Sequence, residues 1–169
     1  DEAVEFDGDF NYVDTSSHEA HIVTNGDGFL TIEFAHSSYS GGAHGNFGSN
    51  YLVLDLTTGA PVELESQVVK GFEKHWVELG AAALRKNAGV GPKAPLTDAG
   101  LFEDKLELNK NWYLVPGGIG YSYNPYEIGP YAAGQITFEL EWKDIAADLK
   151  PGSALAEFAN RFAKKPSTK

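Results

Sequence analysis

Histidine and carboxylate side chains are the groups in this sequence that could bind a metal or transfer a proton. The chain holds 5 histidines and 24 acidic residues among its 169. In the stretch "HEAH", His18 and His21 lie three positions apart, whereas the zinc-binding H-E-x-x-H motif separates its histidines by four. On a strand, this spacing would point the two rings to opposite faces. We therefore expect a surface strand with two exposed histidines.

The acidic start of the chain partly resembles a calcium-binding loop. Asp7, Asp9 and Asn11 occupy the first, third and fifth positions of such a loop. Tyr12 stands where the sharp turn needs glycine, and His18 stands where a bidentate glutamate belongs. The pattern therefore predicts no calcium site.

Other catalytic patterns are absent from the sequence. Cysteine is missing, so thiol nucleophiles, disulfides and cysteine metal sites are excluded. No Gly-x-Ser-x-Gly elbow and no phosphate-binding Gly-x-x-x-x-Gly-Lys loop occurs. The sequence predicts no catalytic residues, no metal ligands and no cofactor. A hydrolase that uses scattered carboxylates with His44 is the least favoured interpretation.

Two stretches have an unusual composition. Residues 39–48, "YSGGAHGNFG", place four glycines around a histidine, and residues 121–134, "YSYNPYEIGPYAAG", hold half of the eight tyrosines. Pro125 and Pro130 fix φ and remove backbone donors, which predicts a stiff loop. Its tyrosines either pack beneath the loop or are displayed, and displayed tyrosine is typical of binding surfaces. The candidate binding residues are Tyr39, Ser40, Gly41, Gly42, His44, Tyr123, Asn124, Pro125, Tyr126, Glu127, Pro130 and Tyr131.

The first half of the chain is typical of antiparallel strands. Residues 18–24 and 29–34 flank "NGDG", where Asn-Gly supplies the positive φ angles of a hairpin turn. Leu30, Ile32 and Phe34 alternate in the second strand, so we expect them on its buried face. A further strand over 51–56 is predicted to form a hairpin with "PVEL".

A long amphipathic helix is predicted over 66–88. Its apolar positions recur every three or four residues, Ser66 is a plausible N-cap, and Gly89 is a plausible stop. A loop over 89–96 precedes a short predicted helix, which begins at Thr97 or Asp98 and carries Leu101, Phe102 and Leu106. Strands are predicted over 111–115, 119–123 and 135–142, followed by helices over 144–149 and 153–163.

This order of elements predicts an α+β fold. We expect an antiparallel sheet with the long helix packed on one face, followed by a C-terminal helix. At 169 residues the chain is long enough for one domain with a substantial core, so we expect a single domain over 1–169.

The charge balance narrows the range of partners. The formal net charge is −11, which argues against a nucleic-acid surface. An acidic domain is soluble, and it also associates faster with a basic partner. No apolar run is long enough to cross a bilayer, so membrane attachment would require an anchor outside this sequence.

Three motifs resemble those of the DUF3298 family, the RsiV-like domains. They are "YSGGAH" at 39–44, "DLTTG" at 55–59, and "YNPYEIGPYAAG" at 123–134. The resemblance covers roughly residues 18–150. Domains of this kind occur outside the cytoplasmic membrane, in anti-sigma factors, beside the catalytic domain of peptidoglycan deacetylases, and in lipoproteins. Members similar to the anti-sigma factor RsiV bind lysozyme.

The resemblance implies a non-enzymatic domain of the cell envelope, in the periplasm or elsewhere outside the cytoplasm, with a lipid anchor in some full-length proteins. Its implied partner is a lysozyme or another peptidoglycan-active protein, and its role could be that of a sensor, an inhibitor or an immunity protein. The alternative is a peptidoglycan- or glycan-binding module that presents Tyr126, Tyr131 and Trp112 to sugars.

Overall fold

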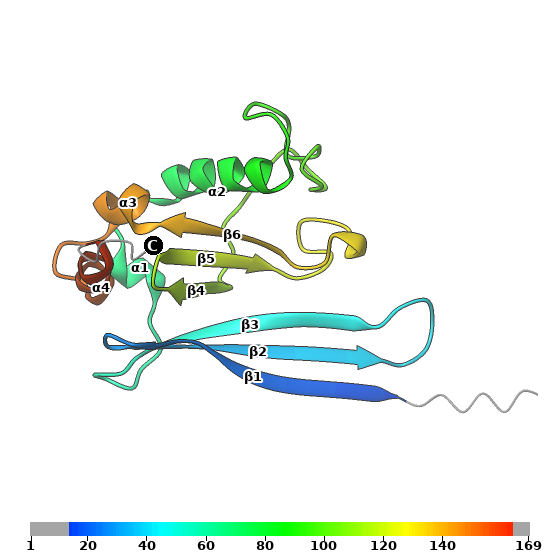
Figure 1. Ribbon diagram of the computed structural model, residues 1–169, viewed down its shortest axis with the longest axis horizontal. Coiled ribbons are helices and arrows are strands. Elements are labelled where there is room, and N and C mark those ends of the chain that lie inside the picture. The colour runs from blue at the N-terminus through cyan, green and yellow to red at the C-terminus, as the bar shows by residue number, and fades with distance from the viewer. Residues whose placement is uncertain (1–13, 164–169) are drawn as a thin grey trace, which may run out of the picture.

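The computed structural model describes residues 14–163 and contains two three-stranded antiparallel sheets. Figure 1 shows the sheets as neighbouring layers, with the helices gathered around the second sheet. The predicted α+β class is confirmed, but the strands form two sheets where the sequence suggested one. Residues 7–12, on which the calcium reading depended, lie outside the described residues. No helix within 14–163 is both long and apolar enough to span a membrane.

The first sheet has the order β1-β2-β3, with β1 over Thr15–Gly26, β2 over Phe29–Tyr39 and β3 over Asn46–Asp55. The predicted hairpin is confirmed. Its two-residue turn consists of Asp27 (φ 53°) and Gly28 (φ 94°), so Asp-Gly, not Asn-Gly, supplies the positive φ angles. The "PVEL" segment forms only an isolated bridge between Leu54 and Pro61.

The buried face of β2 is the opposite of the predicted one. Phe29 and Thr31 are 3% and 0% exposed, whereas Phe34 is 45% exposed and Leu30 and Ile32 are half-buried. The second sheet packs on the Phe29 face, and the hydroxyl of Thr24 donates to the carbonyl oxygen of Leu114 across the junction (2.7 Å). The prediction failed because the apolar alternation lies on the outer face, which no layer of residues 14–163 covers in Figure 1, whereas the buried face carries the polar residue Thr31.

The second sheet has the order β4-β5-β6, with β4 over Trp112–Val115, β5 over Gly118–Tyr123 and β6 over Ile136–Glu141. These strands lie where the sequence predicted them. Phe138 and Leu140 are each 2% exposed, which confirms the inward alternation of β6. Gly120 faces the first sheet, where an added Cβ would meet the ring of Tyr113 at 2.0 Å.

The predicted long helix is split into two. Helix α1 spans Leu64–Gln67 and α2 spans Glu73–Asn87. Between them Gly71 has φ 86°, and Val68 forms a bridge with Leu149. Ser66 therefore lies inside α1 and caps neither helix, whereas Gly89 (φ 69°) follows the end of α2 as predicted. Helix α2 buries Trp76 completely.

The remaining described segments pack against this core. Residues 95–101 form consecutive turns and not the predicted short helix, and Gly100 has φ 93°. Leu101 and Leu106 are nevertheless buried, while Phe102 is 53% exposed. The C-terminal part contains α3 over Trp142–Ile145, the 3-10 turn η2 over Ala146–Asp148 and α4 over Ala154–Ala163. The Phe158 ring of α4 packs edge-on against Phe29 (5.2 Å).

Candidate functional site

The two unusual stretches of sequence meet at one end of the molecule. Residues 40–45, the glycine loop, join β2 to β3, and residues 124–135, the tyrosine loop, join β5 to β6 and contain the 3-10 turn η1 over Tyr131–Ala133. Both loops lie on the right in Figure 1. The His44 ring stacks on Tyr131, with centroids 3.8 Å apart and an interplanar angle of 19°. The two motifs therefore build one surface.

Four rings make up this surface, which we call the aromatic cluster: His44, Phe47, Tyr126 and Tyr131. The Phe47 ring meets the Tyr131 ring edge-on, with centroids 5.5 Å apart. The Tyr126 ring is tilted against the Tyr131 ring, with centroids 5.9 Å apart. The Tyr126 hydroxyl lies 3.4 Å from His44 Nε2. Tyr126 remains 56% exposed and Phe47 37% exposed. The rings therefore brace one another while keeping much of their area toward solvent.

The backbone at Tyr126 is strained. Its φ is 72°, and for a residue with a side chain this left-handed conformation costs roughly 1–3 kcal/mol. Two turn bonds hold it: the Tyr126 amide donates to the Gly129 carbonyl (3.0 Å), and the Glu127 amide donates to the Asn124 carbonyl (3.1 Å). Such strain is concentrated at functional sites. Here it turns the Tyr126 ring outward.

Asparagine side chains fix the tyrosine loop to the first sheet. The Oδ1 atom of Asn124 accepts the Ser49 amide (2.8 Å), and its Nδ2 donates to the Ser49 carbonyl (3.2 Å). Asn111 bonds to the same strand, because its Nδ2 donates to Ser49 O (2.9 Å) and its Oδ1 accepts the Tyr51 amide (2.9 Å). Within residues 14–163, no strand pairs with this edge of β3, and the two asparagines occupy it. The loops are therefore positioned by the junction of the sheets.

Glu127 carries the negative charge of the tyrosine loop. Its side chain is exposed, and its two carboxylate oxygens accept bonds from Asn109 Nδ2 (3.2 Å) and Asn124 Nδ2 (3.4 Å). The carboxylate is therefore held in one orientation beside the aromatic cluster.

Tyr123 is a correction among the predicted binding residues. It is 2% exposed, and its hydroxyl donates to the Glu107 carbonyl (2.8 Å). Burial raises the pKa of Tyr123 above its usual value. Tyr123 therefore belongs to the core and cannot contact a partner.

The other predicted residues lie in or beside the two loops. Tyr39 is 44% exposed, and its hydroxyl donates to the Gly42 carbonyl (3.1 Å). Gly41 and Gly42 have φ angles of 93° and 91°, which glycine adopts without strain. Ser40 and Pro130 are exposed, whereas Asn124 and Pro125 are partly buried.

The surroundings of His44 suit contact better than catalysis. Its Nδ1 lies 2.9 Å from the Gly45 carbonyl oxygen, and its ring is stacked on Tyr131. Within residues 14–163, no carboxylate is hydrogen-bonded to His44, and no group of three metal-binding side chains converges.

The sequence analysis did not identify three residues of this region: Phe47, Asn109 and Asn111. The alternation of apolar and polar residues around Phe47 resembles ordinary strand, and an asparagine that bonds a strand edge has no local signature.

Comparison with known families supports the resemblance seen in the motifs. Residues 66–143 match the profile of DUF3298, described as a protein of unknown function. The predicted resemblance to DUF3298 is thereby confirmed over residues 66–143, while the RsiV-like subtype stays a prediction. No curated protein sequence matches the chain.

Solved structures share the fold. A DUF3298 family member from Bacteroides fragilis NCTC 9343 superposes with a TM-score of 0.75 at 24% identity, over 86% of this chain and 58% of that one. A DUF3298 family protein from Pseudomonas aeruginosa PAO1 gives a TM-score of 0.67 at 21% identity, over 80% of this chain and 62% of that one. The chain thus spans about three-fifths of the length of these structures.

Proposed function

We propose that this chain, whose residues 66–143 belong to the DUF3298 family, is a non-catalytic domain that binds a protein through its aromatic cluster. The observation that carries the proposal is the exposure of two rings that both contact Tyr131: Tyr126 of the tyrosine loop and Phe47 at the start of β3. Rigid aromatic side chains provide contact area at a small cost in conformational entropy, so they serve as anchors in protein interfaces.

The proposed partner is a basic protein of the lysozyme class, or another peptidoglycan-active protein, met outside the cytoplasm. The net charge of −11 favours encounter with a basic surface, and Glu127 adds an oriented carboxylate beside the cluster. The RsiV resemblance of the motifs supports this partner. The role could be that of a sensor, an inhibitor or an immunity protein.

Titration calorimetry with a basic c-type lysozyme tests the proposal. At physiological salt, we expect Tyr126→Ala to weaken binding at least tenfold, because the substitution removes a ring of the cluster that is 56% exposed. Phe34→Ala is the matched control, because Phe34 is also an exposed ring (45%) but lies on the outer face of the first sheet. Equal affinities for the two variants, or no binding to lysozyme at all, would reject the proposal in this form.

The burial of Trp112 argues against the glycan-binding alternative. Trp112 is 9% exposed and belongs to the core, so it cannot stack on a sugar beside Tyr126 and Tyr131. A soluble peptidoglycan fragment in the same calorimeter separates the two functions. Stacking of a neutral sugar on tyrosine would be nearly independent of salt, whereas binding of a basic protein would weaken as salt rises.

A further inference from the structure

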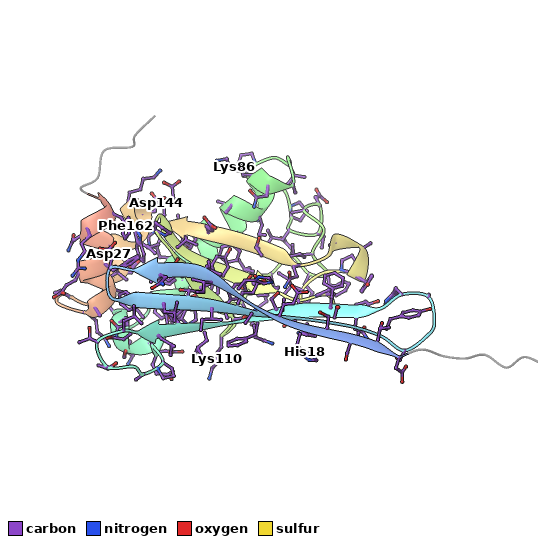
Figure 2. All side chains as sticks on the ribbon, turned by 60° about the horizontal axis from the view of Figure 1, so that its bottom comes forward. His18, Asp27, Lys86, Lys110, Asp144 and Phe162 are labelled. Carbon is purple, nitrogen blue, oxygen red and sulfur yellow. The ribbon has the colours of Figure 1, made fainter. Side chains whose placement is uncertain are left out.

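A groove of about 410 Å³ lies between α2 and β6, away from the aromatic cluster. One wall is β6 from Thr137 to Glu141, and the other is the face of α2 that carries Leu79, Ala83, Lys86 and Asn87. Asp144 of α3 also lines it. Figure 2 labels Lys86 and Asp144, which belong to the green helix and to the orange C-terminal part of the ribbon.

The strand that forms one wall has an open edge. Among the strands of residues 14–163, β6 is the last of its sheet and pairs only with β5, so alternate backbone N–H and C=O groups point away from the sheet. Within residues 14–163, no backbone hydrogen bond from a segment other than β5 reaches the main chain between Thr137 and Leu140. The edge of β3 differs, because Asn111 and Asn124 occupy it. An open edge beside a helix is the geometry in which an extended peptide adds a strand.

The two faces of β6 have different chemistry. Phe138 and Leu140 are buried, whereas Glu139 and Glu141 are exposed on the opposite face. A strand that adds to this edge continues the alternation. Its apolar side chains would lie on the side of Leu79 and Ala83, and its remaining side chains would lie beside the two carboxylates.

Charge favours a basic strand. Glu139, Glu141 and Asp144 line the groove, against one cation, Lys86. Glu141 is paired with Lys143 at 2.7 Å, but both side chains are more than 60% exposed. Such exposed pairs contribute little free energy, so an incoming lysine or arginine can replace Lys143 at small cost.

We propose that the groove between α2 and β6 binds an extended peptide segment with alternating apolar and basic residues, which pairs with the free edge of β6. The segment would belong to a partner protein. This site is separate from the aromatic cluster, so the inference does not depend on the proposed function above.

Fluorescence anisotropy with a labelled Lys-Val-Lys-Val-Lys-Val peptide tests the inference. We expect Glu139→Lys to weaken binding at least tenfold, because it places a like charge opposite the lysines. Glu78→Lys is the matched control: it makes the same change in net charge at an exposed position of α2 outside the groove, so it should change affinity less than threefold. Equal losses of affinity in the two variants would show that the peptide binds by general charge attraction, and would overturn the proposed site.

Backbone methylation distinguishes strand pairing from side-chain contact. Two versions of the peptide carry N-methyl groups on alternate residues, one on the lysines and one on the valines. Only one set of amides can face β6, so one version should lose binding at least tenfold while the other retains it. Equal binding of both versions, or no binding of the unmodified peptide, would contradict the proposal. Tyr126→Ala should leave this binding unchanged.

Discussion

The two halves of the stretch "YSYNPYEIGPYAAG" use the same side chain in opposite ways. Tyr121 and Tyr123, in β5, are 1% and 2% exposed. Tyr126 and Tyr131, after the first proline, lie on the surface of the tyrosine loop, where Tyr126 is 56% exposed. The boundary is Asn124, whose side-chain amide binds Ser49 and ends the strand. The tyrosine content of this stretch therefore combines a core strand with a displayed loop.

This comparison separates fold from function. The Tyr121 ring stacks on Phe138 at 5.4 Å and approaches Trp76 at 6.4 Å, inside the core. The Tyr126 ring meets the Tyr131 ring at 5.9 Å, and its hydroxyl lies 3.4 Å from His44, both of them loop residues of the aromatic cluster. Changes at the first position should therefore affect stability, and changes at the second should affect binding.

The largest expected effect is the loss of a core ring. Tyr121→Ala should lower the free energy of unfolding by about 3–5 kcal/mol, because it removes a fully buried aromatic ring and leaves a cavity. Tyr126→Ala should lower it by less than about 1 kcal/mol. Urea denaturation followed by circular dichroism measures both. Similar losses for the two variants would contradict the division between core and displayed tyrosines.

The boundary residue should have the next largest effect. Asn124→Ala should cost about 2–3 kcal/mol, because it leaves the buried Ser49 amide without its acceptor. Asn50→Ala, at the neighbouring exposed position of β3, is the control and should be nearly neutral. Denaturant titration measures the free energy of unfolding of both variants. Equal values would show that the Asn124 side chain does not join the tyrosine loop to β3.

The junction between the sheets should make stability sensitive to alkaline pH. Burial, with a smaller contribution from Glu139 and Glu33, raises the pKa of Tyr113 to about 12. A tyrosine of the unfolded chain titrates near 10, so the folded state favours the protonated form. Stability should be fully present below pH 10 and fall as the pH rises toward 12.

Tyr113→Phe should flatten that fall, because phenylalanine keeps the ring and removes the proton. The free energy of unfolding, measured in steps from pH 8.5 to about 11.5, checks this prediction. The residual slope of the variant should come from Tyr51, Tyr121 and Tyr123, whose pKa values burial also raises. An unchanged slope would show that Tyr113 is not buried between the sheets.

The smallest expected effect is at the strained turn. Tyr126→Gly should be more stable than Tyr126→Ala by about 1 kcal/mol, because glycine adopts the φ of 72° without steric cost. Thermal and denaturant unfolding of the pair measures the difference. A more stable alanine variant would mean that the loop relaxes out of this conformation when the ring is removed.

Local patterns predicted the elements better than their packing. The hairpin, the strands of the second sheet, the alternation of Phe138 and Leu140, and the stop at Gly89 follow from turn chemistry and side-chain period. The face of β2 does not, because the apolar alternation of Leu30 and Ile32 lies on the outer face, and only packing of the second sheet buries the face that carries Thr31. The sequence also contained no sign of the break at Gly71, whose positive φ divides the helix predicted over 66–88.

The candidate site was half visible in the sequence. Composition marked both loops, because glycine around His44 and proline around Tyr126 are unusual. Their meeting depends on Asn111 and Asn124, which bind the edge of β3 from 60 and 75 positions away. No local pattern reports such long-range bonds, so the stacking of His44 on Tyr131 could not be foreseen.

A map of backbone amide shifts on addition of lysozyme tests the central claim most directly. With the ¹⁵N-labelled domain, we expect shifts concentrated in residues 40–47 and 124–134, with the core strand from Gly118 to Tyr123 little changed. That result would place the partner on the aromatic cluster. Shifts centred instead on the outer face of the first sheet, around Ile22 and Phe34, would contradict the account and give the exposed tyrosines a structural role only.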